Sequence, residues 1–296
     1  MHEVQAKSLL SRWNSMNVYR GCTHGCIYCD SRSACYQFSH RFEDIEVKVN
    51  APDLLEQVLR SRREKCLINS GSMSDPYQPL EEELQLTRRC LELLWQYGFG
   101  AGVLTKSDLV LRDLDLLHAI HERAGAVVQL TLTCADDRLS GIIEPNVVPS
   151  SRRYEVLKAF QARHIPTVVW MDPILPFLTD NEKNIRTLLE WCADAGVYGI
   201  VTFGIGMTLR EGSREYYYRA LNRHFPGLAR QYVEKYGDLY EVMSPQKEQL
   251  AKMVHEICEK YGIRDDPDTV LNFTHTLPER TQQLTLFDLE SLSSGN

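Results

Sequence analysis

The chain has 296 residues, of which 43% are hydrophobic and 25% charged, the composition of a globular protein with one large domain, alone or with an appendage. This composition excludes a disordered, collagen-like or coiled-coil chain, and no apolar run approaches the roughly 18–20 residues of a membrane span. With 33 Lys and Arg against 40 Asp and Glu, the formal net charge is −7. Any contact with nucleic acid must therefore come from a local basic patch.

The cysteine content and the first residues indicate a protein of the reducing cytoplasm. Nine cysteines are an odd number for a disulfide framework, and a chain of this length buries a core without such crosslinks. The opening sequence MHEVQAKSLLSRW has neither a long apolar stretch nor a small-residue cleavage site, so we expect no secretory signal. We expect a cytoplasmic protein with no membrane partner.

Short apolar runs alternate with amphipathic stretches over the first 205 residues. The runs predict strands, and the stretches between them predict helices at a spacing of about 30 residues, which is typical of βα units and a parallel sheet. Six units are too few for an eightfold barrel, so we predict an α/β fold with a partial, TIM-like (β/α)6 barrel. The predicted strands are 16–19, 66–69, 100–105, 127–133, 166–170 and 198–203, and the predicted helices are 52–64, 80–97, 108–123, 152–163 and 181–195.

The pattern changes after residue 203. Three helical stretches, 211–225, 228–236 and 245–261, follow without strands between them, and the chain from Arg264 onward is polar and irregular. We therefore predict three parts, which are a barrel core over 1–210, a helical extension over 211–262 and a flexible tail over 263–296.

Three cysteines are bunched in one segment. Cys22, Cys26 and Cys29 have the spacing C-x3-C-x2-C, so one loop can surround a metal centre with three thiolates. Zinc ribbons use two C-x-x-C pairs and four ligands, and no matching second pair is present. Three ligands on a 4Fe-4S cluster leave one iron open, which is a catalytic arrangement. A zinc site and a structural cluster remain the alternatives.

The spacing C-x3-C-x-aromatic-C resembles the signature of the radical S-adenosylmethionine (SAM) superfamily. Over residues 15–205, further segments resemble its spore photoproduct lyase-like branch: NVYRGC, GSMSDPYQPLE, LTKS, LRDLDLL, TCADD, IEPN and MDPI. The resemblance implies a 4Fe-4S cluster whose open iron binds SAM, and an electron donor such as flavodoxin or ferredoxin. It also implies reductive cleavage of SAM to a 5′-deoxyadenosyl radical that abstracts hydrogen from a substrate.

Catalytic groups of a parallel barrel lie at the carboxyl ends of the strands, and the resemblance implies their roles. Tyr28 would meet the adenine of SAM, Ser70, Ser72 and Ser74 its amino group, and Lys106 its carboxylate. Thr131 and Thr133 would contact the ribose, and Gly204 would admit the adenine. Asp172 is either a cofactor ligand or a turn cap. The serines could instead satisfy their own turn, and Lys106 could be a solvated surface residue.

The hydrogen donor departs from the branch pattern. Relatives are thought to use a cysteine just after the second strand, but alignment on Ser74 and Asp75 places Ser72 there. A serine O–H bond is too strong for that role. Cys134, at the end of the predicted fourth strand, would face the same cavity and is the candidate replacement. The alternative is that Cys134 is a buried apolar side chain.

Two further features bear on partners. Gln283–Phe287, QLTLF, resembles the short motif that docks on the bacterial β sliding clamp; alternatively these apolar residues cover the chain's own barrel. Residues 210–230 contain five arginines interleaved with tyrosines, which suits phosphate contact and base stacking. An amphipathic helix packed on the barrel explains the same pattern.

Three functions are consistent with these features. The first is a radical SAM enzyme that acts on damaged or modified nucleic acid. The second keeps the radical chemistry but acts on tRNA, a peptide or a small metabolite. The third is a non-catalytic metal-cluster module tethered to a replication complex.

Overall fold

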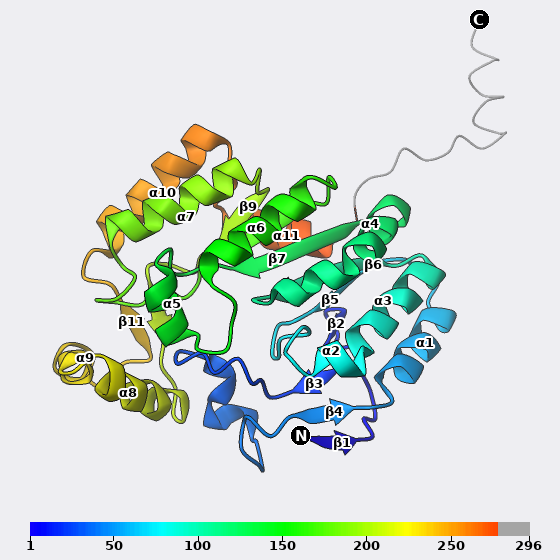
Figure 1. Cartoon of the computed structure of the whole chain (residues 1–296), viewed down its shortest axis with the longest axis horizontal. Helices are drawn as coiled ribbons and strands as arrows, with labels where there is room; N and C mark the ends of the chain where they lie inside the picture. The colour runs from blue at the N-terminus through cyan, green and yellow to red at the C-terminus, as the bar shows by residue number, and fades with distance from the viewer. Residues whose placement is uncertain (278–296) are drawn as a thin grey trace, which may run out of the picture.

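The computed structural model describes residues 1–277 and contains one twisted, fully parallel sheet (Figure 1). Its strands lie in the order β2-β5-β6-β7-β8-β9, so neighbours in sequence are neighbours in space, as in a βα barrel that does not close. The partial (β/α)6 architecture with six parallel strands is confirmed, although the predicted strand 16–19 is divided between β2 and a separate strand, Tyr19–Arg20, of another sheet. The strands are β2 (Ser15–Met16), β5 (Leu67–Ser70), β6 (Gly100–Thr105), β7 (Ala126–Thr131), β8 (Thr167–Trp170) and β9 (Gly199–Val201).

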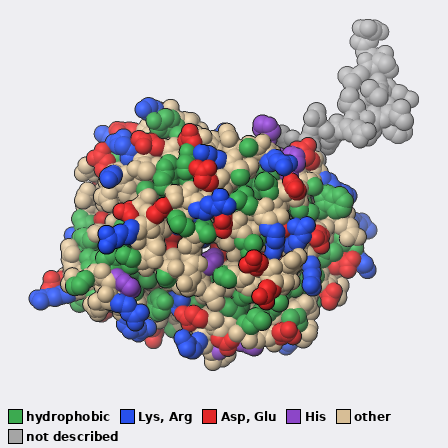
Figure 2. Space-filling view, viewed as in Figure 1, with side chains coloured by type: hydrophobic (Ala, Val, Ile, Leu, Met, Phe, Trp, Pro, Cys, Tyr) green, Lys and Arg blue, Asp and Glu red, His purple; other side chains and the backbone are tan. Residues whose placement is uncertain are grey.

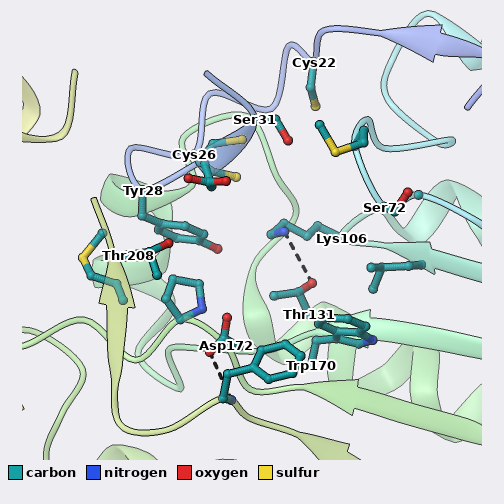
Figure 3. Close-up of a pocket in the computed structure, with 18 of the residues that line it drawn as sticks. Cys22, Cys26, Tyr28, Ser31, Ser72, Lys106, Thr131, Trp170, Asp172 and Thr208 are labelled. Atoms are coloured by element: carbon teal, nitrogen blue, oxygen red, sulfur yellow. Dashed lines mark hydrogen bonds between the residues drawn. The ribbon is translucent and has the colours of Figure 1, made fainter. Parts of the chain in front are cut away.

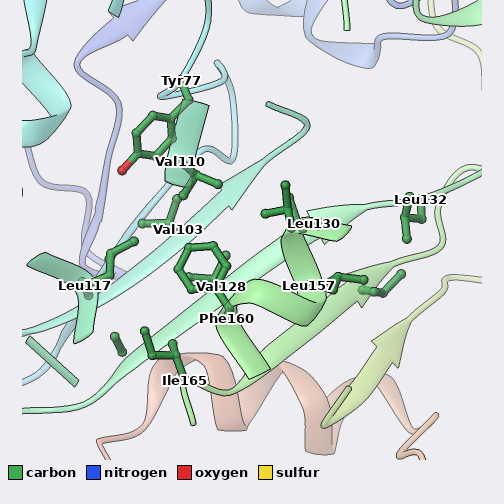
Figure 4. Close-up of a cluster of buried hydrophobic side chains, with 14 of the residues drawn as sticks. Tyr77, Val103, Val110, Leu117, Val128, Leu130, Leu132, Leu157, Phe160 and Ile165 are labelled. Carbon is green, nitrogen blue, oxygen red and sulfur yellow. The ribbon is translucent and has the colours of Figure 1, made fainter. Parts of the chain in front are cut away.

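Helices cover the outer face of this sheet (Figure 1). Val103 and Val128 point outward from adjacent strands and pack among Leu117 and Phe160 of the helices (Figure 4). All four side chains are fully buried. The covering helices are α1 (Ala51–Ser61), α3 (Leu86–Tyr97), α4 (Leu114–Arg123), α6 (Ser150–Gln161) and α7 (Glu182–Asp194).

Two predicted helices are divided. The stretch 80–97 forms α2 (Glu81–Leu84) and α3, because Gln85 between them adopts a left-handed conformation with φ 52°. The stretch 108–123 begins as a 3₁₀ helix over Asp108–Asp113 and continues as α4. A short α5 (Asp137–Ile143) after β7 was not predicted. The hydrophobic period alone does not mark these breaks.

The concave face of the sheet is filled near its amino end by α11 (Pro267–His275). Val270 of this helix packs on Val127, Val168 and Val201, which point inward from three strands. A Cβ on Gly199 at the start of β9 would lie 2.7 Å from the Val270 side chain, so the helix needs a glycine there. The expectation of an irregular chain from Arg264 onward is wrong for this segment, because its apolar residues are too few to show a helical period.

Two small sheets were also not predicted. β1 (His2–Val4), β4 (Glu46–Lys48) and β3 (Tyr19–Arg20) form a three-stranded sheet that leads into the cysteine segment. β10 (Gly206–Thr208) pairs with β11 (Glu241–Met243), so the extension is not purely helical. Strands this short are fixed by distant partners rather than by local sequence.

The extension contains α8 (Ser213–His224), α9 (Leu228–Tyr236) and α10 (Lys247–Tyr261), which agree with the three helical stretches. The partition into core, extension and tail stays a prediction. Among the helices of residues 1–277, none combines the length and apolarity needed to cross a membrane.

The packing of α11 yields a test. Val270→Ala removes two methyl groups from a fully buried site and should lower the free energy of unfolding by about 2 kcal/mol. Asn272→Ala, on the exposed side of the same helix, should change it by less than about 0.5 kcal/mol. Chemical denaturation of both variants under anaerobic conditions measures the difference, and equal values would contradict the buried position of α11.

Candidate active site

A cavity of about 550 Å³ opens at the carboxyl ends of the parallel strands (Figure 3). Its walls come from the cysteine segment, from the loops after β5, β6, β8 and β9, and from the β10–β11 pair. Residues that line it include Cys22, Cys26, Cys29, Tyr28, Ser72, Ser74, Asp75, Lys106, Thr131, Trp170, Asp172, Phe203, Gly206, Tyr240 and Met243. The structure thus brings most of the predicted site residues into one cavity.

The three clustered thiols are free and share one wall of this cavity. Cys22 and Cys26 are buried, and Cys29 is half-buried. The segment between them has no regular secondary structure, so hydrogen bonds from elsewhere must hold it. The turn after α5 supplies two of them, because Ile27 N donates to Ile143 O at 2.9 Å and Asn146 N donates to His24 O at 3.1 Å.

A fully buried ion pair anchors Tyr28, the aromatic residue of the motif. The Tyr28 hydroxyl donates to Glu144, and Arg153 Nη2 donates to the other oxygen of Glu144 at 2.5 Å. Arg153 Nη1 donates to the carbonyl of Thr131 at 2.7 Å. The pair therefore joins the cysteine loop to the carboxyl end of β7. Burial, followed by the charge of Glu144, raises the pKa of Tyr28, which keeps its hydroxyl protonated and able to donate.

Asp75 is the second anchor. It accepts from Thr105 Oγ1 at 2.6 Å and from Lys106 N at 2.8 Å, and its Oδ2 lies 3.4 Å from Nδ1 of buried His24. Burial alone would raise the pKa of Asp75, but His24 and these donors lower it to about 2. A charged Asp75 thus ties the loop after β5 both to the end of β6 and to the cysteine loop.

Lys106 directs its ammonium group into the middle of the cavity (Figure 3). Its Nζ donates to Thr131 Oγ1 at 3.4 Å and lies 6.0 Å from the centre of the Tyr28 ring. This position fits the predicted role of Lys106 as the partner of an anionic ligand group.

The three predicted serines have different environments. Ser72 is exposed in the cavity wall and lies 3.3 Å from Ser15 Oγ. Ser74 is buried and donates to Gly21 O at 2.5 Å, so it holds the cysteine loop. Ser70 does not line the cavity, and its hydroxyl faces Gly102 O at 3.4 Å. Gly71 is required here, because at φ 101° a Cβ would lie 2.0 Å from Leu104 O.

Besides Ser70, three predicted residues lie outside the cavity lining. Thr133 is fully buried, and its hydroxyl has no hydrogen-bond partner within the described part of the chain. Gly204 lies next to the lining, which contains Gly206 instead. Cys134 donates to Asp136 O at 3.3 Å and packs behind Tyr28 in a hydrophobic cluster. The expectation that Cys134 faces the cavity is wrong. Val127 and Thr131 of β7 point into the barrel and Val128 points outward, so strand alternation assigns residue 134 to the outer side.

Sequence reasoning missed an aromatic wall. Trp170 ends β8 and Phe203 follows β9, and their rings contact edge-to-face with centroids 6.0 Å apart. Tyr240 reaches the cavity from the loop before β11. Trp170 and Phe203 could have been predicted, because each is an aromatic residue at the end of a predicted strand. Tyr240 could not, because the β10–β11 pairing that positions it leaves no pattern in the local sequence.

The chain matches the model of the Radical SAM superfamily over residues 16–192. This protein belongs to the radical SAM superfamily. Members use a 4Fe-4S cluster and SAM. The three free thiols on one cavity wall fit the iron ligands that the cluster needs. The Lys106 ammonium opposite them fits a partner for the carboxylate of SAM. When bound, the cluster and SAM supply the 5′-deoxyadenosyl radical for hydrogen abstraction.

Curated relatives and solved structures resemble this chain over most of its length. An uncharacterized protein of Mycobacterium tuberculosis is 29% identical over 287 residues, covering 90% of this chain and 82% of that protein. An uncharacterized protein of Methanocaldococcus jannaschii is 29% identical and covers 84% and 86%. Spore photoproduct lyase complexed with dinucleoside spore photoproduct superposes with a TM-score of 0.64 at 13% identity, over 89% of this chain and 80% of that one, a likeness of fold.

The buried ion pair gives a prediction. Arg153→Ala leaves Glu144 buried without its partner and should lower the free energy of unfolding by about 3–5 kcal/mol. Arg152→Ala removes a neighbouring arginine whose pair with Asp108 is exposed and should cost about 0–1 kcal/mol. Anaerobic denaturation of both variants provides the comparison. A similar loss in both would contradict the anchoring role of Arg153.

Asp172 gives a prediction with a pH signature. Burial raises its pKa from 3.8 to about 6, so in the folded state the proton is retained to higher pH than in the unfolded state. Above pH 6 the charged carboxylate then costs the folded state up to about 3 kcal/mol, and below pH 4 this cost is absent. Asp172→Asn should therefore stabilise the protein at pH 7.5 and have little effect at pH 4. Thermal unfolding at both pH values tests this, and a pH-independent effect would oppose it.

Proposed function

We propose that this radical SAM enzyme abstracts hydrogen from a damaged or modified nucleic acid, in a reaction of the spore photoproduct lyase type. The observation that carries the proposal is the aromatic wall. Phe203 is 60% exposed and Tyr240 45% exposed, although both line the cavity. Exposed rings beside a catalytic cavity suit a base that has left its stack, since every base offers a flat face for stacking.

The solved relatives support this substrate class. Spore photoproduct lyase has been solved with bound AdoMet and dinucleoside spore photoproduct, and its fold extends over most of this chain. Fold alone does not transfer a substrate, so the argument depends on the aromatic wall of this chain.

The arginines of residues 210–230 divide into two groups. Arg214 donates to the carbonyls of Gly237, Asp238 and Leu239, so it serves the fold. Arg219 and Arg223 are exposed one turn apart on α8 and are the better candidates for phosphate contact. On the face shown in Figure 2, acidic and basic side chains are mixed, and the chain has a net charge of −7, so phosphate contact would need a small local patch.

Two partners belong to the same proposal. A flavodoxin or ferredoxin would deliver the electron that radical SAM enzymes require. The β sliding clamp would bind Gln283–Phe287, a segment that lies outside the described residues. Docking on the clamp would bring the enzyme to DNA without a large basic surface.

SAM cleavage tests the proposal. Reconstituted enzyme and the Cys26→Ala variant are incubated anaerobically with SAM and dithionite, and 5′-deoxyadenosine is quantified. We expect the wild type to form it and UV-irradiated DNA to increase the yield several-fold over undamaged DNA. Cys26→Ala should lose the iron, the visible absorption and the product.

Other outcomes separate the alternatives. Stimulation by tRNA, peptides or metabolites but not by DNA would replace the substrate class while keeping the radical chemistry. A complete absence of 5′-deoxyadenosine with an intact cluster would indicate a non-catalytic module.

A further inference from the structure

Asp172 lies at the end of the cavity opposite the cysteines (Figure 3), and Phe203 lines the same cavity. Asp172 follows β8, and Phe203 follows β9. The backbone N–H of Phe203 is 3.5 Å from Asp172 Oδ1, so the position of the carboxylate is coupled to the residue that carries the ring. Within residues 1–277, no hydrogen bond occupies Oδ2 of Asp172, which leaves this oxygen as an acceptor for a ligand.

The Phe203 ring packs against Trp170, whose position is fixed by hydrogen bonds. Trp170 contacts Phe203 edge-to-face at an interplanar angle of 65°, and the Trp170 indole N–H donates to Gln129 Oε1 at 2.8 Å. Gln129 in turn donates to Asn69 at 3.4 Å, and Asn69 donates to the carbonyl of Thr274 in α11 at 3.1 Å. This polar chain crosses the inside of the barrel and fixes the indole, so Phe203 has a rigid neighbour on one side and an exposed surface on the other.

We propose that Asp172 and Phe203 form a base-reading subsite, in which Phe203 stacks on the base and Asp172 accepts a hydrogen bond from its ring N–H. This inference rests on the proposed function and specifies its substrate. Bases with a ring imide or lactam N–H, such as thymine, uracil and guanine, satisfy the free acceptor. Adenine and cytosine have no protonated ring nitrogen at the corresponding position and can offer only their exocyclic amino group.

The environment of Asp172 favours a ligand that donates a hydrogen bond to its carboxylate. Burial raises its pKa to about 6, and Lys106 and the Phe203 N–H only partly offset that effect. A desolvated carboxylate without a salt-bridge partner is costly for the folded protein, and a donor N–H from the ligand relieves part of this cost. Hydrogen bonds to charged groups are stronger than neutral ones, so this contact discriminates between bases.

The experiment compares thymidine dinucleotide with its N3-methyl analogue, which has the same ring but no ring N–H. Isothermal titration calorimetry uses cluster-reconstituted protein with SAM bound, in the absence of reductant. We expect the wild type to bind the methylated ligand about tenfold more weakly or worse. Asp172→Leu should bind both ligands alike, and Asp172→Asn, which keeps a neutral acceptor and the same shape, should retain part of the preference.

Two further variants separate the hydrogen bond to Asp172 from stacking on Phe203. Phe203→Leu should weaken both ligands equally and leave their ratio unchanged, because the acceptor is intact. Glu241→Gln, which neutralises a carboxylate on the β11 side of the cavity, should also leave the ratio unchanged. A ratio that falls in Glu241→Gln as far as in Asp172→Leu would contradict the assignment to Asp172.

The remaining outcomes overturn specific parts. Equal binding of the two ligands by the wild type, with SAM cleavage still stimulated by DNA, refutes the subsite and leaves the proposed function. Loss of SAM affinity in Asp172→Leu makes Asp172 a cofactor ligand and refutes the subsite. Asp172-dependent binding of an amine such as cadaverine, with no binding of either dinucleotide, refutes both proposals and indicates a cationic substrate held by the carboxylate and the rings.

Discussion

The cysteine loop must hold three thiols in one arrangement without a helix or strand to support it. The structure meets this constraint with two charged anchors that tie the loop to the ends of different strands. Glu144 and Arg153 hold Tyr28 against the end of β7, and Asp75 holds the end of β6 beside His24. Because each anchor joins the loop to a strand end, the thiols and the cofactor-binding side chains share one rigid frame, which is the preorganisation that radical chemistry requires.

Contacts at the amino end of the barrel also support the cavity. The inner face of a partial barrel is left uncovered by the outer helices, and α11 fills it with Val270 against three inward valines. The carbonyl of Thr274 at the end of this helix then begins the polar chain through Asn69 and Gln129. The helix that completes the core therefore also determines where the aromatic wall stands.

The positions of the strands and of the thiols can be predicted from local sequence, whereas the buried charged residues that hold the cysteine loop cannot. β6 lies at the predicted residues because its apolar run is continuous and bounded, and the cysteine spacing identified the thiol wall. His24, Glu144 and Arg153 were missed because a buried charge is recognisable only through its partner, which lies elsewhere in the chain. Cys134 was misplaced because it shares the strand parity of Val128, which packs on the outer face, and not that of Thr131, which lines the cavity.

The filled amino end of the barrel affects the order in which ligands can bind. Since α11 fills the amino end of the lumen, ligands exchange at the carboxyl end, where Phe203 is exposed. A substrate that stacks on this ring would lie between solvent and the more buried Lys106 and Thr131, which line the same cavity. Under the proposed function, SAM would therefore have to enter before the substrate closes this route.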